Sequence, residues 1–331
     1  MNVLVTGAAG YIGSVIAARL LAAGHAVTVY DDLSRGHRAA VPADAALVEG
    51  DIRDTERLAA ALTHGACDAI VHMAALAEVA ESVAFPEGYH DVNTGGTRAV
   101  IEAALAAGVS RIVFSSTAAV YGAPDAIPID ERAPLAPANP YGDSKLAAER
   151  LLGEAAAASG GRLATVALRY FNAAGAAGPR GEDHAPESHL VPLALAATRD
   201  GGVLKIFGDD YPTPDGTCVR DYVHVSDLAA AHVAALERLP QAAGAYNLGT
   251  GRGSSVREVV QAVTAATGRA PSVAIAPRRA GDPPVLVASH ERARLALGWQ
   301  PRRSLDDIVA DAWRWMDDHP RGYDDKGDGR R

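Results

Sequence analysis

A glycine-rich turn near the N-terminus constrains the fold of this chain more than any other feature. Gly7, Gly10 and Gly13 stand three residues apart, after the apolar segment 2–6 and at the start of the apolar segment 12–23. Glycines permit a tight strand-to-helix turn and a close approach of the backbone to a ligand. The N-terminus of the following helix then presents free N–H groups and a positive dipole to an anion. A glycine turn without a ligand is the alternative, but the strand-and-helix context favours a turn that binds a pyrophosphate.

Short β-branched segments alternate with alanine- and leucine-rich ones through the first half of the chain. The expected strands are 2–6, 26–30, 46–48, 69–72, 111–115 and 165–169, and the expected helices are 12–23, 55–62, 89–107 and 141–158. Strands that are apolar throughout are typical of a parallel sheet with helices on both faces. The predicted fold class is therefore α/β, with a doubly wound parallel Rossmann sheet.

The alternation changes after residue 169, where Gly/Pro clusters at 175–186 and 209–216 interrupt it. Shorter elements follow, with helices expected near 226–238, 256–267 and 305–316. We expect residues 1–170 to form the nucleotide-binding domain. Residues 171–316 should form a smaller mixed α/β substrate lobe, with segments interleaved with the first domain, and residues 317–331 a flexible tail.

Charge and composition exclude several classes of function. The net charge is −9 without a dense Lys/Arg run, which argues against nucleic-acid binding. The sequence has no stretch of 18 or more apolar residues, so we expect no membrane span, and the N-terminus lacks a signal-peptide pattern. Cys67 and Cys218 are the only cysteines and form no metal-binding pair, so we predict no metal site and no disulfide. These features favour a cytoplasmic protein.

The expected cofactor is NAD. Asp31 stands eighteen residues after Gly13, just past the second strand, where a carboxylate can accept from ribose hydroxyls and repel a 2′-phosphate. A solvated turn acid is the alternative. Small or polar residues after the third and fourth strands are expected at the same sheet edge. The predicted cofactor contacts are Gly7, Gly10, Tyr11, Ile12, Gly13, Asp31, Asp32, Ser34, Asp51, Ile52, Met73, Ala74, Ala75, Asn93, Tyr141, Lys145 and Tyr170.

Tyr141 and Lys145 form a Tyr-x-x-x-Lys pair at the start of an expected helix, so both side chains face one side. A free phenol titrates near pH 10, but a neighbouring ammonium and a positive nicotinamide favour the phenolate. Tyr141 is thus the candidate general base, and Lys145 its tuner and a donor to the nicotinamide ribose. Thr117, at the end of the fifth strand, is the third candidate catalytic residue, although strand-end hydroxyls also cap turns.

Together these motifs resemble the extended short-chain dehydrogenase/reductase family. The second half narrows the resemblance to the UDP-glucose 4-epimerases, through segments 168–172, 209–225, 246–251 and 276–283. The resemblance covers residues 2 to about 323. It implies C4 epimerisation of UDP-galactose and UDP-glucose through a 4-keto sugar, and a homodimer packed through 89–107 and 141–158. The implied UDP-hexose contacts are Thr117, Asn172, His189, Leu190, Leu204, Phe207, Arg220, Tyr222, Arg279, Asp282 and Leu286.

The chain departs from the family pattern at a few positions. Ala77 stands where a lysine often touches the cofactor, and Leu286 where a tyrosine often narrows the sugar pocket. The smaller Leu286 predicts tolerance of N-acetylated sugars. A nucleotide-sugar dehydratase would carry an Asp-Glu pair at Ala118 and Ala119. The remaining alternatives are another nucleotide-sugar epimerase, or a non-catalytic NAD sensor that happens to retain Tyr141 and Lys145.

Overall fold

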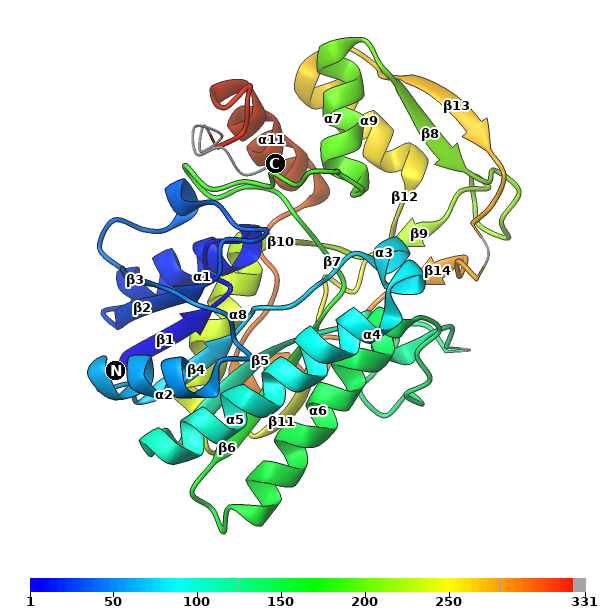
Figure 1. Ribbon diagram of the computed structural model, residues 1–331. Coiled ribbons are helices and arrows are strands. Elements are labelled where there is room, and N and C mark those ends of the chain that lie inside the picture. The colour runs from blue at the N-terminus through cyan, green and yellow to red at the C-terminus, as the bar shows by residue number, and fades with distance from the viewer. Residues whose placement is uncertain (125, 280, 324–331) are drawn as a thin grey trace.

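A seven-stranded parallel sheet forms the centre of the computed structural model, which describes residues 1–124, 126–279 and 281–323 (Figure 1). The strand order is β11-β6-β5-β4-β1-β2-β3. The strands are β1 Asn2–Thr6, β2 Ala26–Asp31, β3 Ala46–Glu49, β4 Ala69–His72, β5 Arg111–Thr117, β6 Ala164–Tyr170 and β11 Gly244–Leu248. This confirms the doubly wound α/β fold and all six expected strands. The seventh strand, β11, is an addition that the sequence did not predict.

Helices cover both faces of the sheet. One face carries α1 Tyr11–Ala22, α8 Val225–Arg238 and α10 Glu291–Leu297, and the other carries α2 Thr55–His64, α5 Gly96–Ala107 and α6 Pro140–Ala158. Val3 and Val5 of β1 pack on the first set, whereas Leu4 packs on the second. Because both faces of the central strands β1 and β4 are buried, these strands are mainly apolar rather than alternating, whereas the edge strand β3 is only partly buried.

The order of the strands reverses beside β1. The chain passes from β1 to β2 and β3 on one side, and then returns to β4, β5 and β6 on the other. Ligands of open parallel sheets bind at such a switch point, beyond the carboxyl ends of the strands. In this chain the turn after β1 and the segment after β4 meet there.

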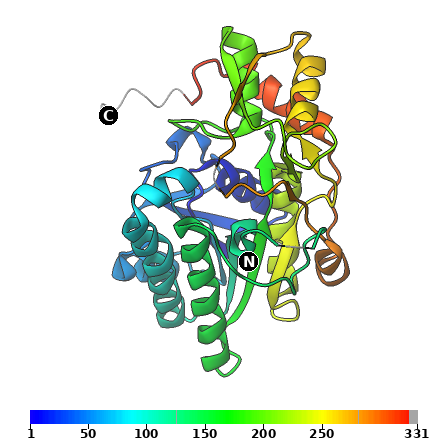
Figure 2. The ribbon, with the colours of Figure 1, turned by 90° about the vertical axis from the view of Figure 1, so that its right-hand side faces the viewer.

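A smaller lobe lies at one end of the sheet layer (Figures 1 and 2). Its helices α7 Leu190–Asp200, α9 Val256–Thr267 and α11 Leu305–Asp318 share an apolar core. Its short sheets pair β8 Val203–Phe207 with β13 Ser272–Ala276, β7 Asn172–Ala174 with β10 Tyr222–His224, and β9 Val219–Arg220 with β12 Ser254–Ser255 and β14 Val285–Leu286. The helix α7 was not predicted from the sequence.

The chain crosses between the two parts several times. Although α8 and β11 follow residue 170, both pack in the sheet layer. The sequence predicts a flexible tail from residue 317, but the structure differs over residues 317–323. There α11 continues to Asp318, and Tyr323 is 5% exposed beside Trp315. The rest of that predicted tail, 324–331, lies outside the described residues. In the part of the chain that the structure describes, no helix has both the length and the apolarity to cross a membrane.

The expected helix 89–107 is interrupted. It consists of α4 Pro86–Tyr89, a π-helical turn His90–Gly95 and then α5, and it is preceded by α3 Val79–Ala84. Short 3-10 turns lie at Arg38–Ala40 and Ala118–Tyr121. π-helical turns are rare and often occur at functional sites. This one carries Asn93, one of the predicted cofactor residues.

Candidate active site

The glycine turn touches the end of β4 backbone to backbone. Gly7 has φ +69°, and a Cβ atom there would lie 2.5 Å from the Ala74 nitrogen. A Cβ atom on Gly13 would lie 2.3 Å from the Gly7 oxygen. No larger residue fits either position without moving backbone, which is the reason the sequence places glycine there.

The N-terminus of α1 is open to an acceptor. Gly10 is its N-cap residue, and no side chain among the described residues caps it. The N–H groups of Tyr11, Ile12 and Gly13 therefore depend on a partner from outside the helix. An uncapped N-terminus behind a turn that tolerates no Cβ fits the pyrophosphate of a dinucleotide.

Asp31 holds this turn in place. Its carboxylate accepts from Ala9 N and from Leu33 N, each at 2.9 Å, and the residue is 7% exposed. Burial raises the Asp31 pKa above its usual value, and the two backbone hydrogen bonds oppose that rise. Each oxygen keeps a lone pair for a ribose hydroxyl. Beyond it, Asp32 accepts from the backbone and the hydroxyl of Ser34.

The predicted adenine contacts lie on the turn after β3. The Asp51 carboxylate pairs with Arg53, which lowers the Asp51 pKa, and Arg53 also pairs with Asp91. Ile52 is buried against Gly96 at the start of α5. The Asp51 side chain is thus already used within the protein, and contact with adenine stays a prediction.

A buried chain of polar groups links the glycine turn to the π-helical turn. Thr6 Oγ1 lies 2.8 Å from His72 Nδ1, and His72 Nε2 lies 3.1 Å from Thr97 Oγ1. The Thr97 hydroxyl donates to the Asn93 backbone oxygen. This assigns one direction: the Thr6 hydroxyl donates to His72, which donates to Thr97. Burial lowers the His72 pKa to about 3, so the ring is neutral.

Asn93 acts on the loop after β4 and on α6. Its Oδ1 accepts from Leu76 N, and its Nδ2 donates to Leu76 O and to Ser144 Oγ. Both amide hydrogens are used, and the residue is 2% exposed. The structure therefore makes Asn93 a positioning residue for the predicted cofactor loop. Sequence reasoning missed its partners; polar residues at the ends of apolar strands, such as Thr6 and His72, were the available signal.

Tyr141 and Thr117 meet at the carboxyl edge of the sheet. Asn139 caps α6 through Gly142 N at 2.9 Å, and Pro140 is the first residue of the helix, so Tyr141 lies in its first turn. The Thr117 hydroxyl, at the end of β5, accepts from Ala119 N at 3.1 Å and lies close enough to Tyr141 to lower the pKa of that phenol. The ring of Tyr89 packs edge-on against that of Tyr141.

The pKa shifts of Tyr141 and Lys145 differ from those that the sequence predicts. Burial raises the Tyr141 pKa above its usual value, and the neighbouring Thr117 hydroxyl only partly offsets that rise. The sequence predicts that Lys145 lowers the Tyr141 pKa, but Lys145 is not among the groups that shift it. Lys145 is itself 2% exposed, with Nζ 4.7 Å from the Phe114 ring centroid, and burial lowers its pKa to about 7. Burial therefore disfavours the charged form of both groups, an effect that spacing alone did not reveal.

A buried ion pair joins α6 to the central sheet. Arg169 makes two hydrogen bonds to Glu149, at 2.9 and 2.6 Å, and the Ser116 hydroxyl donates to the same carboxylate. Arg169 also donates to the Tyr121 hydroxyl, which donates to Asn247 Oδ1. This network ties α6 to β5, β6 and β11, and the sequence did not predict it.

Tyr170, a predicted cofactor residue, lies at the end of β6. Its hydroxyl is 2.5 Å from His232 Nε2, and His232 Nδ1 is 2.8 Å from Leu228 O. His232 therefore donates to Leu228 and accepts from Tyr170. Burial lowers the His232 pKa to about 4. The Tyr170 hydroxyl is also 3.6 Å from the sulfur of Met73, at the end of β4.

The charged residues implied for UDP lie in the smaller lobe. Arg220 of β9 pairs with Asp282, so two residues assigned to different parts of UDP contact each other. Arg279 lies over the Phe207 ring at 4.1 Å from its centroid. An arginine that pairs with one carboxylate retains donors for a diphosphate, because the guanidinium carries five N–H groups.

The other implied substrate residues differ in exposure. Leu204 and Tyr222 are buried in the core of the lobe, so a ligand could meet only their backbone. Asn172 begins β7, and its N–H donates to Asp221 O at 2.8 Å. His189 is the N-cap residue of α7, and Leu190 is its first residue. Leu286 packs beside Tyr121 and Phe171.

The chain is similar to known proteins along nearly its whole length. Residues 3–249 match the NAD dependent epimerase/dehydratase family. The UDP-glucose 4-epimerase of Streptomyces lividans is 51% identical over 327 residues, covering 98% of each chain. The UDP-glucose-4-epimerase of Stenotrophomonas maltophila, solved with bound NAD and formylated UDP-arabinopyranose, is 42% identical, with a TM-score of 0.93 over 97% of this chain and 99% of that one. The Bifidobacterium longum enzyme, in complex with NAD+ and UDP, is 37% identical, with a TM-score of 0.91 over 98% and 100%.

Proposed function

The chain belongs to the NAD-dependent epimerase/dehydratase family, among its UDP-glucose 4-epimerases, and we propose that it interconverts UDP-galactose and UDP-glucose by inverting C4 of the hexose. One observation carries the proposal. Tyr141 meets the Thr117 hydroxyl at the carboxyl edge of the sheet, on the helix that also carries Lys145. The glycine turn lies at the same edge, where β1 and β4 end.

The residues divide the work of proton transfer and orientation. NAD, when bound, supplies a hydride acceptor for C4 and a positive nicotinamide ring that favours the phenolate. Tyr141 takes the proton of the C4 hydroxyl, and Thr117 binds the same oxygen. Lys145 donates to the nicotinamide ribose. Burial raises the Tyr141 pKa, which keeps the phenol protonated until the positive ring is beside it.

The smaller lobe anchors UDP while the 4-keto sugar turns over. Arg220 and Arg279 neutralise the diphosphate, and Asp282 accepts from the uridine ribose. The pairing of Arg220 with Asp282 holds both side chains in place for these contacts. The backbone of β8, with Leu204 and Phe207, runs past the uracil. An anchored UDP lets the sugar present its other face for reduction without leaving the site.

Particular residues argue against two alternative functions, a dehydratase and a non-catalytic binding protein. A dehydratase needs a proton donor and acceptor directly after Thr117, but Ala118 and Ala119 occupy those positions in a 3-10 turn. A binding protein without catalysis does not need a half-buried Tyr141 beside a strand-end hydroxyl. Both features favour the epimerase.

We further propose that the sugar pocket admits N-acetylated UDP-hexoses. Leu286 of β14 packs beside Val120, Tyr121 and Phe171, and it lacks the ring that would narrow the pocket. UDP-N-acetylglucosamine should then turn over under conditions where UDP-galactose reacts. A protein that converts UDP-galactose but leaves UDP-N-acetylglucosamine unchanged would contradict this extension.

The proposed assembly is a homodimer, and the proposed location is the cytoplasm. The helices expected at the dimer interface, α5 and α6, lie side by side on one flank of the molecule (Figure 1). Four helices could then pack between two copies. Light scattering should give twice the mass of the chain, and a monomeric mass would contradict the dimer.

The function is tested by incubating the purified protein with UDP-galactose and separating the products by chromatography. UDP-glucose that forms without added cofactor would indicate both the reaction and retained NAD. UDP-glucose that forms only with added NAD would indicate loose retention, for which the exposed Ala77 is the candidate cause. A product lighter by one water would identify a dehydratase. NAD binding with no product would favour the sensor.

A further inference from the structure

A compact group of histidines and glutamates lies in the linker between β7 and α7; it includes none of Tyr141, Lys145 and Thr117, although its member His189 is also an implied substrate contact. We call it the 182–189 cluster; its members are Glu182, His184, Glu187 and His189. One ligand atom of each lies within 4.8 Å of the others. We propose that this cluster binds one divalent transition-metal ion with the ligand preference of Zn2+, and that the ion fixes the linker against the nucleotide-binding domain.

The spacing of the ligand atoms suits a tetrahedral ion. Glu182 Oε1 lies 3.3 Å from His184 Nδ1 and 2.9 Å from His189 Nδ1. The Glu187 oxygens lie 3.6 and 3.0 Å from the same two nitrogens. Zinc bound by imidazole and carboxylate at roughly 2.0–2.2 Å places tetrahedral neighbours about 3.3–3.6 Å apart. The two Glu187 distances belong to different oxygens, Oε2 and Oε1, so with either one as the ligand three of the six edges are at, or within a few tenths of an ångström of, that spacing.

The chemistry of the group also suits such an ion. Two carboxylates and two neutral imidazoles neutralise a divalent cation, and imidazole favours zinc and its neighbours over magnesium or calcium. The side chain of Glu182 is only 8% exposed, and a buried carboxylate requires a cationic partner. Among the described residues, His184 Nδ1 is buried without a hydrogen bond of good geometry, although both carboxylates face it.

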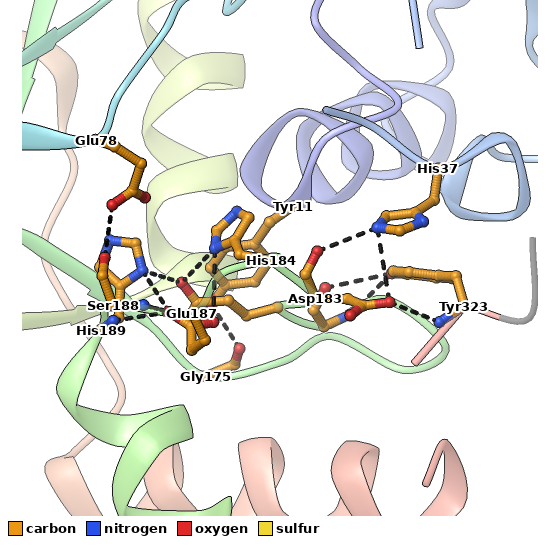
Figure 3. A network of polar contacts seen from close by, with 12 residues as sticks. Tyr11, His37, Glu78, Gly175, Asp183, His184, Glu187, Ser188, His189 and Tyr323 are labelled. Carbon is orange, nitrogen blue, oxygen red and sulfur yellow. Dashed lines mark hydrogen bonds and ion pairs between the residues drawn. The ribbon is translucent and has the colours of Figure 1, made fainter. Parts of the chain in front are cut away.

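Surrounding groups orient the cluster, as they do in metal sites generally. Glu187 Oε1 accepts from the backbone N–H groups of Ser188 and His189, each at 2.7 Å. The ring of His184 stands edge-on to that of Tyr11, whose hydroxyl donates to Gly175 O at 2.5 Å. Figure 3 shows these side chains converging between the start of α1 and the linker.

The position of the cluster gives the ion a structural role. His189 is the N-cap residue of α7, and the Ser188 hydroxyl donates to Glu78 of the segment after β4. An ion held by the cluster would fix the start of α7 relative to α1, where the pyrophosphate is expected. Coordination through Nδ1 leaves Nε2 of His189 available for the substrate diphosphate.

Protons are the competing occupants. Burial lowers the pKa of both histidines, but the glutamates outweigh it and raise the pKa of His184 to about 9 and that of His189 to about 11. Without a metal, the cluster would be two protonated histidines paired with two carboxylates. The two occupants are distinguished by whether the protein binds a stoichiometric ion.

The test is a zinc titration of chelator-treated full-length protein against a chromophoric competitor. Wild type should bind one ion per chain, and so should the control His64→Gln, which removes an exposed histidine from α2. Glu182→Gln and His184→Gln should each weaken binding by more than about tenfold. Less than one equivalent in wild type, or equal affinity in the cluster variants, would overturn the proposal.

Cobalt(II) provides a test that needs no variant. Wild type loaded with cobalt should show the intense visible bands of a tetrahedral site with nitrogen and oxygen ligands. The weak bands of six-coordinate cobalt would contradict a four-ligand protein site. Because neither readout depends on turnover, failure of the metal proposal and failure of the proposed function are distinguishable.

Discussion

The amide nitrogen of Asn93 donates a hydrogen bond to the Ser144 hydroxyl oxygen at 2.9 Å, and this contact joins the π-helical turn to the helix of the proposed base. The Ser144 hydroxyl in turn donates to the Tyr141 backbone oxygen at 2.8 Å. The same Asn93 side chain holds Leu76 on the loop after β4. One buried amide therefore sets the position of the proposed base relative to the proposed cofactor loop.

Replacing this amide should cost stability. Asn93→Leu leaves the backbone groups of Leu76 without partners in a buried site, and we expect a loss of about 3 kcal/mol in the free energy of unfolding. Asp91→Asn, in the same turn, removes only an exposed pair with Arg53 and should cost less than about 1 kcal/mol. Denaturant unfolding measures both. Equal losses would show that the Asn93 contacts do not contribute specifically.

Gly13 should tolerate no side chain. The Cβ atom of Gly13→Ala would meet backbone at 2.3 Å, so we expect the glycine turn to shift and NAD affinity to fall by more than about tenfold. Gly153→Ala is the matched control: Gly153 lies within α6, and its added Cβ atom meets nothing within 4 Å. That change should stabilise the protein by about 1 kcal/mol. NAD titration and thermal unfolding measure the two effects, and unchanged NAD affinity in Gly13→Ala would contradict the assigned turn.

The buried pair of Glu149 and Arg169 should be strongly coupled to stability. Their side chains are 9% and 5% exposed, so Glu149→Gln leaves a buried guanidinium without its counter-charge. We expect a loss of about 3 kcal/mol in the free energy of unfolding. Glu154→Gln, on the exposed side of the same helix, should change it by less than about 0.5 kcal/mol. Equal denaturation midpoints for the two variants would exclude a structural contribution from the pair.

Buried neutral histidines predict a loss of stability in acid. Burial lowers the pKa of His72 to about 3 and that of His232 to about 4, from usual values of 6.5. Between its folded pKa and 6.5, each histidine binds a proton in the unfolded chain but not in the folded chain. Its contribution to stability is therefore complete above pH 6.5 and is lost as pH falls towards 4 for His232 and towards 3 for His72.

The variant His232→Gln isolates one of these groups. Glutamine can still accept from Tyr170 but does not titrate, so the variant should lose about 2 kcal/mol less than wild type between pH 7 and 4.5. Urea unfolding across this pH range measures the difference. Parallel pH profiles for the two proteins would contradict a neutral buried His232.

Local patterns were sufficient to predict the sheet and the glycine turn. Each of the six expected strands is an apolar segment bounded by turn residues, and Gly7 and Gly13 stand where a Cβ atom has no room. The strand β11 was missed because an edge strand that follows β6 by some 70 residues pairs through the tertiary fold, not through local pattern. The break in the helix 89–107 was missed because the π-helical turn depends on Asn93 reaching Leu76 and Ser144.

The candidate site was predictable in its residues but not in its electrostatics. The spacing of Tyr141 and Lys145 predicts a shared face, yet only the fold reveals that burial raises one pKa and lowers the other. Likewise, the pairing of Arg220 with Asp282, sixty-two residues apart, is a tertiary contact. The 182–189 cluster has no familiar metal-binding spacing, and its ligand atoms converge only because the linker folds back on itself.

The most direct test of the account compares UDP-galactose conversion by wild type and by Tyr141→Phe, each saturated with NAD, with NAD binding measured in parallel. The variant retains the ring that packs against Tyr89 but loses the hydroxyl that Thr117 contacts. We predict that wild type forms UDP-glucose and that the variant is slower by about 10²- to 10⁴-fold while NAD binding persists. Equal rates in the two proteins would contradict Tyr141 as the base, and no UDP-glucose from wild type would contradict the proposed reaction itself.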